Sequence, residues 1–279
     1  MRFTKMEGIG NDYIYIDGFR ETVPDPAALS VRMSRYHFGC GSDGLILILP
    51  SEKADFRMRM FNNDGSESEM CGNGIRCVGK YCHDRGLTQK TDFTVETGAG
   101  VKRLLLTLKD GQTESVRVDM GAPELDGLSI PSLIPGKPVI GHPLTANGRD
   151  YRVTLVSMGN PHAVCFVDDP DAAPLREDGP VLEADPVFPR KANIEFVRVQ
   201  DRAHAVMRVW ERGTGETLAC GTGACAAMVA CALNGLTGRE AEMSLPGGKL
   251  LVHWDETDGR VYMTGPATFV YDGEWLGEL

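Results

Sequence analysis

The chain of 279 residues contains no long apolar segment. No run approaches the roughly 20 apolar residues that a membrane-spanning helix needs. The first residues, MRFTKMEGIGNDY, also lack the apolar centre of a secretory signal peptide. We therefore expect a cytoplasmic protein that has no membrane partner.

Cysteine is sparse, and its spacing argues against two common uses. The eight cysteines are too few for a disulfide scaffold in a chain of this length. None lies in a C-x2-C pair, the spacing typical of zinc ribbons and thioredoxin-type redox sites. We expect free thiols in a reducing compartment and no metal site.

Basic residues are also fewer than acidic residues. The chain has 29 basic and 39 acidic residues, for a formal net charge of -10. Nucleic acid and anionic membranes would repel such a protein at long range. A small polar ligand is the expected partner. The 42% hydrophobic content is ordinary for globular domains, and the length favours two of them.

An internal repeat organises what is present. Cys220 lies 149 residues after Cys71, and the same offset carries MRMF at 58–61 onto MRVW at 207–210. It also carries Gly10 in GND onto Gly159 in GNP. Agreement over three separated blocks indicates the duplication of a whole domain. Under this offset Tyr13, Gly44, Asn62, Glu67, Gly72 and Gly74 fall on His162, Asn193, Glu211, Glu216, Gly221 and Gly223.

Each half shows the same order of predicted elements. Alternation and β-branched residues predict three strands, followed by a polar turn and a helix that begins at the cysteine. The strands are expected at 12–19, 44–50 and 55–61 and at 161–169, 193–201 and 204–210, with hairpins at 93–121 and 243–265. We predict an α/β (α+β) fold with mostly antiparallel strands.

The second helix and the chain's end complete the predicted fold. AAMVACALNGL is apolar on nearly every face, so we expect a sheet to wrap around it. The repeat places a boundary near residue 120, which gives a first domain at 1–119 and a second at 120–265. We expect the tail, 266–279, to return to the first domain.

Two of the cysteines differ from the other six. In CGNG and CGTG, Cys71 and Cys220 precede a glycine-containing turn that enters a helix. Unpaired N–H groups and the helix dipole stabilise a thiolate there, so we expect a lowered pKa. The remaining six are expected to be small buried hydrophobes, namely Cys40, Cys77, Cys82, Cys165, Cys225 and Cys231.

Two reactive thiols from two similar halves suggest work on opposite faces of one carbon atom. A thiolate would remove the α-proton of an amino acid from one face while a thiol delivers a proton to the other. The glycine turns would leave backbone amides free to bind an α-carboxylate at the helix N-termini. Tight turns alone would also explain these glycines.

Several polar residues in the matched blocks are further candidates. His162 and Glu211 could set the protonation of a thiol, although a structural hydrogen bond would also explain His162. Arg212 could grip a second carboxylate or lie in solvent. The asparagines fit either turns or the binding of a zwitterionic ligand through their amides, and they are Asn11, Asn62, Asn160 and Asn193.

Seven segments together resemble one enzyme family over essentially the whole chain. They are KMEGIGNDY, FNNDGSESEMCGNGIRC, SMGNPH, RKANIEF, WERGTGETLACGTGACAA, LPGG and YMTGPATFVYDG. The family is diaminopimelate epimerase, an isomerase that interconverts L,L- and meso-diaminopimelate in lysine and peptidoglycan precursor biosynthesis. The resemblance implies an enzyme that works without pyridoxal phosphate or another cofactor.

The resemblance also implies a fold and a set of site residues. The fold has two similar domains, each a strand-rich barrel around a central helix, with the active site between them. The paired catalytic cysteines match Cys71 and Cys220, His162 and Glu211 match residues that modulate the thiols, and Tyr271 matches one at a homodimer interface. The implied substrate contacts are Asn11, Asn62, Gly72, Asn73, Asn160, Asn193, Glu211, Arg212, Gly221 and Thr222.

Two departures from the family pattern and two alternatives remain. Glu7 replaces a common histidine, and Gly44 replaces a glutamine that some members use toward substrate, so only the Gly44 backbone could make that contact. A proline racemase or hydroxyproline epimerase shares the paired cysteines, but it has histidine where this chain has Asn73. A non-catalytic module, either a thiol switch that joins Cys71 and Cys220 reversibly or a metal-binding one, is the alternative from another class.

Overall fold

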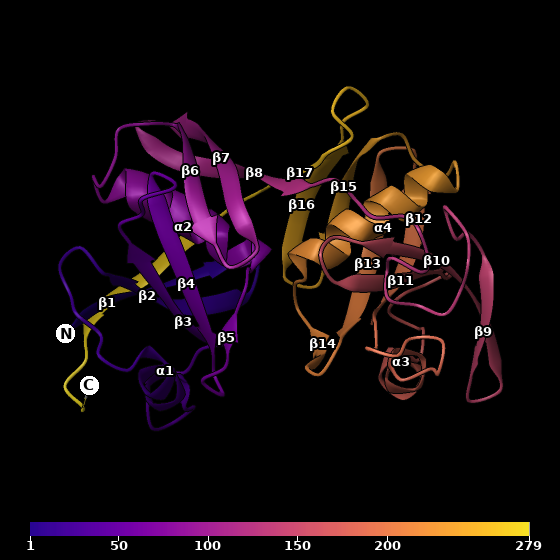
Figure 1. Cartoon of the computed structure of the whole chain (residues 1–279), viewed down its shortest axis with the longest axis horizontal. Helices are drawn as coiled ribbons and strands as arrows, with labels where there is room; N and C mark the ends of the chain where they lie inside the picture. The colour runs from indigo at the N-terminus through magenta and orange to yellow at the C-terminus, as the bar shows by residue number, and fades with distance from the viewer. Residues whose placement is uncertain (279) are drawn as a thin grey trace. The chain divides into compact units, whose positions relative to one another are not determined.

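The computed structural model describes residues 1–278, which form two compact units. The first contains residues 1–119 and the C-terminal residues from Thr264, and the second contains residues 120–263. In each unit, strands surround one helix and a second helix packs outside them (Figure 1). The predicted α+β fold class is confirmed. Within residues 1–278, no helix combines the length and the apolar character needed to cross a membrane.

The first unit has two helices and a largely antiparallel sheet. The strands pair in the order β18, β1, β2, β3, β4, β6, β7, β8, and only β2–β3 and β4–β6 are parallel. β5 pairs with β4 as a short extra strand. The elements are β1 Arg2–Gly8, β2 Asn11–Asp17, α1 Pro26–Ser34, β3 Gly44–Leu49, β4 Phe56–Asn62, β5 Glu67–Ser68, α2 Gly72–Asp84, β6 Asp92–Thr97, β7 Gly100–Lys109, β8 Gln112–Gly121 and β18 Thr268–Glu274.

The second unit repeats this arrangement. Its strands pair in the order β9, β10, β11, β12, β13, β15, β16, and β11–β12 and β13–β15 are parallel. β14 pairs with β13. The elements are β9 His142–Ala146, β10 Arg149–Ser157, β11 Pro161–Phe166, α3 Leu175–Glu183, β12 Asn193–Asp201, β13 His204–Glu211, β14 Gly215–Thr217, α4 Gly221–Leu233, β15 Glu240–Leu245, β16 Gly248–Trp254 and β17 Val261–Gly265.

The 149-residue offset relates the two units element by element. Adding it to the bounds of α1 and α2 gives the bounds of α3 and α4. The two parallel strand pairs also occur at matching places. The repeat seen in three sequence blocks therefore extends to the helices and to the strand order.

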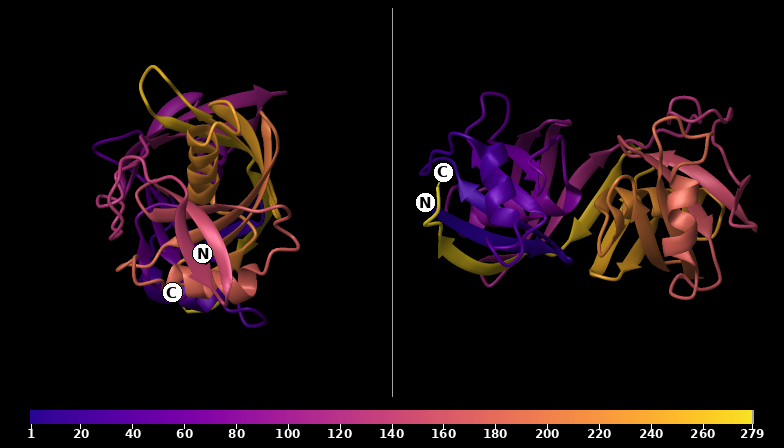
Figure 2. Two further views of the ribbon diagram at one scale, coloured as in Figure 1. Left: turned by 90° about the vertical axis from the view of Figure 1, so that its right-hand side faces the viewer. Right: turned by 90° about the horizontal axis from the view of Figure 1, so that it is seen from below.

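The helix α4 lies inside the sheet of its own unit. Every residue from 223 to 231 is buried, and the helix contacts β10, β11, β12, β15 and β16. Figure 2 shows strands around α4 in the left view, as the apolar sequence of this helix predicts. In the first unit, α2 buries residues 72–79 and contacts β1, β2 and β7.

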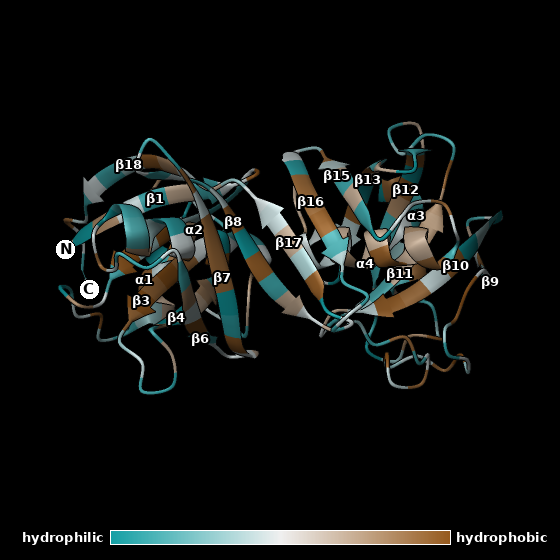
Figure 3. Ribbon diagram, turned by 90° about the horizontal axis from the view of Figure 1, so that it is seen from above, coloured by the Kyte–Doolittle hydropathy of each residue, from teal (hydrophilic) through white to brown (hydrophobic). Residues whose placement is uncertain are grey.

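The central strands are covered on both faces, which explains their continuous apolar sequences. In β3, Leu45 and Leu47 pack with Leu29 and Met33 of α1. The residue between them, Ile46, points the other way, toward α2. β7 instead buries Leu104 and Leu106 while Leu105 between them is exposed, and bands of brown and teal follow one another along this strand (Figure 3).

The C-terminal strand completes the first unit. β18 runs antiparallel to β1, with Arg2 opposite Glu274, and the N-terminal amino group of Met1 donates to Trp275 O at 3.3 Å. The two ends of the chain therefore lie side by side (Figure 1).

Several elements carry no clear signal in the sequence. α1 has only nine residues, and α3 contains Gly179 and Pro180, which both disfavour a helix interior. Gly179 is needed because a Cβ there would lie 2.8 Å from Trp210 Cγ. Tertiary packing thus stabilises a helix that the local sequence disfavours.

The predicted burial of Cys40 is a smaller correction. Cys40 is only half-buried, whereas the other five cysteines assigned to the core are buried.

Gly44 offers a test of the packing between β3 and β4. A Cβ at this position would lie 2.1 Å from the backbone oxygen of Phe61 and 2.9 Å from Tyr13 Cε1. We expect Gly44→Ala to lower the free energy of unfolding by about 3 kcal/mol, because backbone atoms cannot move aside cheaply. Urea denaturation followed by fluorescence measures this.

Gly238→Ala is the matched control, since nothing lies within 4 Å of a Cβ there. We expect that variant to stay within about 0.5 kcal/mol of the parent. Equal stabilities for the two variants would contradict the close contact at Gly44.

Candidate active site

Cys71 is the N-cap of α2. Its backbone is extended, with φ -129° and ψ 119°, and the Gly74 N–H donates to its sulfur at 3.3 Å. The sulfur thus takes the place that a serine or aspartate oxygen usually occupies at a helix N-terminus. The helix start holds the side chain at the end of a buried element.

Cys220 has the same geometry at the start of α4. Its φ is -126° and its ψ is 109°, and the Gly223 N–H donates to its sulfur at 3.4 Å. The two cysteines are therefore equivalent in local structure as well as in sequence. Each belongs to a different unit and defines a half-site of its own.

The third residue of each helix is a glycine with a side chain of the neighbouring strand close to it. A Cβ at Gly74 would lie 2.7 Å from Ile46 Cδ1, and a Cβ at Gly223 would lie 2.9 Å from Glu195 Oε1. The offset relates Ile46 to Glu195. The two half-sites therefore differ at this position, with methyl groups in one and a carboxyl group in the other.

In the first half-site, Asn11 is the direct partner of Cys71. The thiol donates to Asn11 Oδ1 at 3.2 Å, and Asn11 Nδ2 donates to Asp43 Oδ2 at 2.6 Å. Asp43 also accepts from the Asp12 N–H at 3.0 Å, which ties the loop before β3 to the start of β2. The carboxylate of Asp43 thereby orients the asparagine amide toward the sulfur.

Other predicted residues surround this helix start. Gly72 and Asn73 are buried in the first turn, and the Asn73 Oδ1 accepts from the guanidinium of Arg76 at 2.9 Å. Arg76 is fully buried and also donates to the backbone oxygens of Gly72 and Pro266, at 3.2 and 3.0 Å. It therefore joins the first turn of α2 to the segment that leads into β18.

Asn62, Gly44 and Tyr271 lie elsewhere in the first unit. Asn62 ends β4, is paired with Gly44 of β3, and donates to Ser66 Oγ at 3.0 Å. Gly44 is buried within its strand. Tyr271 is exposed on β18, in edge contact with Phe3 at a centroid distance of 6.0 Å.

In the second half-site, a buried histidine links an acid to an amide. His162 Nδ1 lies 2.6 Å from Glu195 Oε1, and its Nε2 lies 3.0 Å from Asn160 Oδ1. Asn160 Nδ2 donates to Thr222 Oγ1 at 3.3 Å, and Thr222 Oγ1 lies 3.6 Å from Cys220 Sγ. His162 therefore reaches Cys220 through Asn160 and Thr222.

The expected lowering of the Cys220 pKa is wrong for this structure. Burial raises the pKa of the Cys220 thiol well above its usual value, and the negative charge of Glu211 raises it further. Thr222 and the Gly223 N–H act in the opposite direction but do not outweigh burial. The sequence shows the helix start, which favours a thiolate, but it does not show how completely solvent is excluded.

β13 ends at Glu211, and Arg212 follows it in the chain. Asn193 begins β12, the strand that pairs with β13. Glu211 Oε1 accepts from the hydroxyl of Thr217 on β14. Asn193 is buried, with Nδ2 donating to Pro161 O at 3.1 Å and Oδ1 accepting from the Arg212 N–H at 2.8 Å. Arg212 is exposed, and its guanidinium donates to Arg190 O at 3.0 Å. Asn193 thus positions the backbone that carries Arg212.

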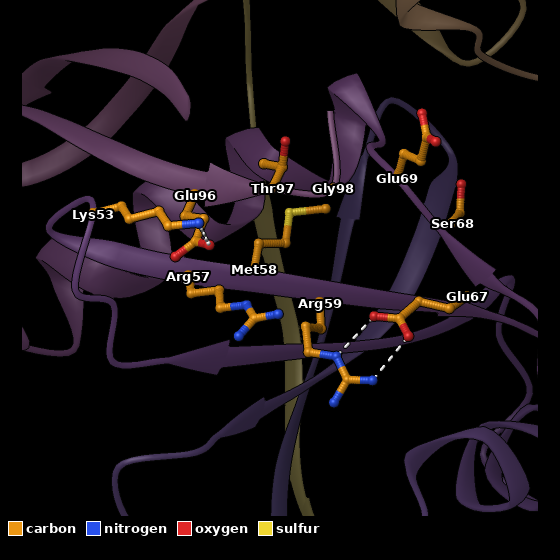
Figure 4. Close-up of a pocket in the computed structure, with 10 residues that line it drawn as sticks. All are labelled: Lys53, Arg57, Met58, Arg59, Glu67, Ser68, Glu69, Glu96, Thr97 and Gly98. Carbon is orange, nitrogen blue, oxygen red and sulfur yellow. Dashed lines mark hydrogen bonds and ion pairs between the residues drawn. The ribbon is translucent and has the colours of Figure 1, made fainter. Parts of the chain in front are cut away.

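A surface pocket in the first unit provides a contrast. It is lined by Lys53, Arg57, Arg59, Glu67 and Glu96 among others (Figure 4). Arg59 forms a bidentate pair with Glu67 at 2.7 and 2.8 Å, and Lys53 lies 3.8 Å from Glu96. Metal binding is not supported: within residues 1–278, no group of three or more His, Cys, Asp or Glu side chains is placed to hold a metal ion.

The most informative residue missed in the sequence is Glu195. Its only signal is an acidic residue inside the apolar strand NIEFV, which ordinary strand alternation can accommodate on a solvent face. Asp43 and Thr217 were also missed, because they act through loops and short strands. Neither falls in one of the repeat-matched sequence blocks.

Comparison with known proteins agrees with these local features. A family model described as diaminopimelate epimerase matches residues 3–125 and 154–270. A diaminopimelate epimerase from Acetivibrio thermocellus is 56% identical over 274 residues, which are 98% of this chain and 98% of that protein. One from Methanococcus maripaludis is 53% identical over 274 residues, 98% of this chain and 99% of that protein.

Solved structures share the fold at much lower identity. A hydroxyproline epimerase from Agrobacterium vitis, with bound trans-4-hydroxy-L-proline, has a TM-score of 0.70 at 16% identity. The match covers 98% of this chain and 91% of that one. With the family model spanning most of both units and relatives more than half identical over nearly their full length, the chain belongs to the diaminopimelate epimerase family.

Proposed function

We propose that this protein interconverts L,L- and meso-diaminopimelate without a cofactor, using Cys71 and Cys220 as its two acid–base groups. The observation that carries the proposal is the pair of repeat-related cysteines, each capping a buried helix through its sulfur. Relatives named diaminopimelate epimerase, more than half identical over nearly the full chain, support the substrate. The reaction would serve lysine and peptidoglycan precursor biosynthesis.

The chemistry requires one thiolate and one thiol. The thiolate takes the α-proton, the C–H electron pair remains on the α-carbon, and the thiol delivers its proton to the opposite face. The amides at the helix starts, including those of Gly72 and Gly221, are suited to hold the α-carboxylate and stabilise the charge that develops. After turnover, the two cysteines have exchanged protonation states.

Before substrate binds, the surroundings of Cys220 favour the thiol. The Cys71 thiol donates to an amide oxygen, and burial raises the pKa of Cys220. We infer that the α-ammonium group of the substrate promotes the loss of one proton, because a nearby positive charge favours a thiolate. Ionisation is thereby linked to substrate binding.

The remaining predicted contacts belong to this proposal. Glu211 adjusts the protonation of Cys220 through its charge, and the exposed guanidinium of Arg212 would bind the distal carboxylate of diaminopimelate. His162 acts through Asn160. The proposed substrate contacts are Asn11, Asn62, Gly72, Asn73, Asn160, Asn193, Glu211, Arg212, Gly221 and Thr222, with the Gly44 backbone as a further candidate.

The location and assembly are also proposals. Catalytic thiols need a reducing compartment, which favours the cytoplasm. The tyrosine at 271 is exposed on β18, where it suits the interface of a homodimer. No role for nucleic acid or a membrane is proposed.

The central test is epimerisation of L,L-diaminopimelate in deuterated water. We expect the protein to form the meso isomer and to incorporate deuterium at the α-carbon, while L-proline remains unchanged. Cys71→Ala and Cys220→Ala should each lower kcat by about 1,000-fold, because each removes one acid–base group. Chiral chromatography and mass spectrometry measure the products.

Cys77→Ala and Cys225→Ala are matched controls, since these cysteines are buried in the same two helices. They should keep activity within about 3-fold, as expected away from the chemistry. Full epimerisation by either Cys71→Ala or Cys220→Ala would contradict the two-base mechanism. Turnover of proline but not of diaminopimelate would contradict the substrate.

The raised pKa of Cys220 predicts a pH dependence. A thiol with a raised pKa stays protonated as pH rises, so its thiolate-dependent alkylation should still be increasing above pH 9.0, the usual value from which it is raised. In Cys71→Ala protein without substrate, we expect the rate of Cys220 alkylation by iodoacetamide to go on rising above that pH, where an ordinary thiol would begin to level off. Peptide mass spectrometry identifies the modified residue.

Glu211→Gln tests how the negative charge of Glu211 contributes to the pKa of Cys220. Removing the negative charge should lower the pKa of Cys220 and increase its alkylation rate at a given pH. A plateau near neutral pH in the protein that retains Glu211 would be inconsistent with a buried thiol at position 220.

The assembly can be tested with Tyr271. We expect the protein to sediment as a dimer, and Tyr271→Ala to shift the equilibrium toward monomer, because the ring would lose its contacts across the interface. Analytical ultracentrifugation over a range of concentrations measures this. A monomeric parent protein at all concentrations would refute the dimer.

A further inference from the structure

The side chain of Glu195 is fully buried next to the start of α4. Its neighbours in β12, Ile194 and Phe196, belong to the core around α3, and Glu195 points the opposite way, toward Gly223. At the matching place in the first unit, Ile46 packs against Gly74. At this position of the repeat, the second unit therefore has a carboxyl group and the first unit has a hydrocarbon side chain.

Hydrogen bonds continue from this carboxyl group to the sulfur. They connect Glu195 with His162 at 2.6 Å, His162 with Asn160 at 3.0 Å, and Asn160 with Thr222 at 3.3 Å, and Thr222 lies 3.6 Å from Cys220 Sγ. In the first unit, Tyr13 stands at the position of His162, and Asn11 contacts the Cys71 sulfur directly. In the second unit, Asn160 stands at the position of Asn11 and reaches the sulfur through Thr222.

The direction of each bond follows from what each atom can donate. Asn160 Oδ1 is an acceptor, so His162 Nε2 must carry the hydrogen. A neutral imidazole protonated at Nε2 has a bare Nδ1, which then accepts from a protonated Glu195 Oε1. The other possibility is an imidazolium beside a carboxylate. Both arrangements have a net charge of zero.

The surroundings of Glu195 favour the neutral acid. Burial raises the pKa of its carboxyl group and outweighs the opposite effect of His162, and the negative charge of Glu211 on β13 acts in the same direction as burial. The other titratable groups that face it are His162 and Cys165 on β11 and Cys220 on α4. In residues 1–278, the second oxygen, Oε2, is buried and has no hydrogen-bond partner. A carboxylate in that position would be costly.

We propose that Glu195 is a positioning residue of the Cys220 half-site: as a neutral acid it donates to His162 Nδ1, fixes the Nε2–H tautomer, and thereby orients Asn160. Asn160 Nδ2 then donates a hydrogen bond to Thr222 Oγ1. Because the oxygen is an acceptor in that bond, its own hydroxyl hydrogen points toward Cys220. When Cys220 gives up its proton, this hydroxyl and the Gly223 N–H stabilise the thiolate. The role in turnover rests on the proposed epimerase function.

The tautomer is measurable without any activity assay. We expect nitrogen-15 NMR of histidine-labelled protein to show His162 with a protonated Nε2 and a bare Nδ1, with the signal assigned by its loss in His162→Gln. Glu195→Gln should leave this tautomer unchanged, because its amide N–H can donate to Nδ1 in the same way. A His162 that is protonated at Nδ1 in the unsubstituted protein would overturn the proposal.

Two substitutions at position 195 test the consequence for turnover. Glu195→Gln should keep kcat/KM within about 3-fold, whereas Glu195→Ile should lower it about 10-fold or more, since the partner that orients the imidazole is lost. Isoleucine is a suitable replacement because Ile46 occupies the matching place against Gly74. A large loss in Glu195→Gln, or full activity in Glu195→Ile, would overturn the proposal.

Ile46→Val is the matched control in the first unit, and we expect it to leave kcat/KM within about 2-fold. If Glu195→Ile fails to fold, the NMR measurement and Glu195→Gln still decide the question. If the unsubstituted protein does not epimerise diaminopimelate, the proposed function fails while the tautomer measurement still tests Glu195. Normal epimerisation together with the wrong tautomer would contradict only the inference about Glu195.

Discussion

The structure of both half-sites depends on one hydrogen bond, which a backbone N–H in the first helical turn donates to the sulfur of the cysteine before the helix. It fixes the cysteine at the end of a rigid, buried element rather than on a loop. The donating residue is a glycine in both units, and Ile46 or Glu195 packs closely against it. The glycine turns noted in the sequence therefore serve packing as much as ligand binding.

Burial of the central helices has a chemical consequence. α4 is enclosed by strands, and solvent is excluded from the start of the helix together with its core. A helix N-terminus alone favours a thiolate, but exclusion of water and the charge of Glu211 have the larger effect at Cys220. In this environment a thiol is the stable form, and a proton held there is available for delivery to a substrate.

The repeat made much of the fold and both helix-capping cysteines predictable from the sequence. Strands such as β3 and β12 and the wrapped helix α4 have apolar patterns that few other structures would satisfy. α3 was missed because Gly179 and Pro180 oppose a helix, and only the contact with Trp210 explains Gly179. Glu195 was missed because a single acidic residue in a strand does not reveal that both faces of the strand are covered.

The pairing of β18 with β1 bears on how the protein is made. β18 leaves the ribosome after the whole of the second unit, whereas β1 leaves before it. The second unit is a continuous segment and can fold while synthesis proceeds, but the first unit must wait for β18. Until β18 has been synthesised, the edge of β1 that it later covers is exposed, so the first unit is finished only after the second unit has been made.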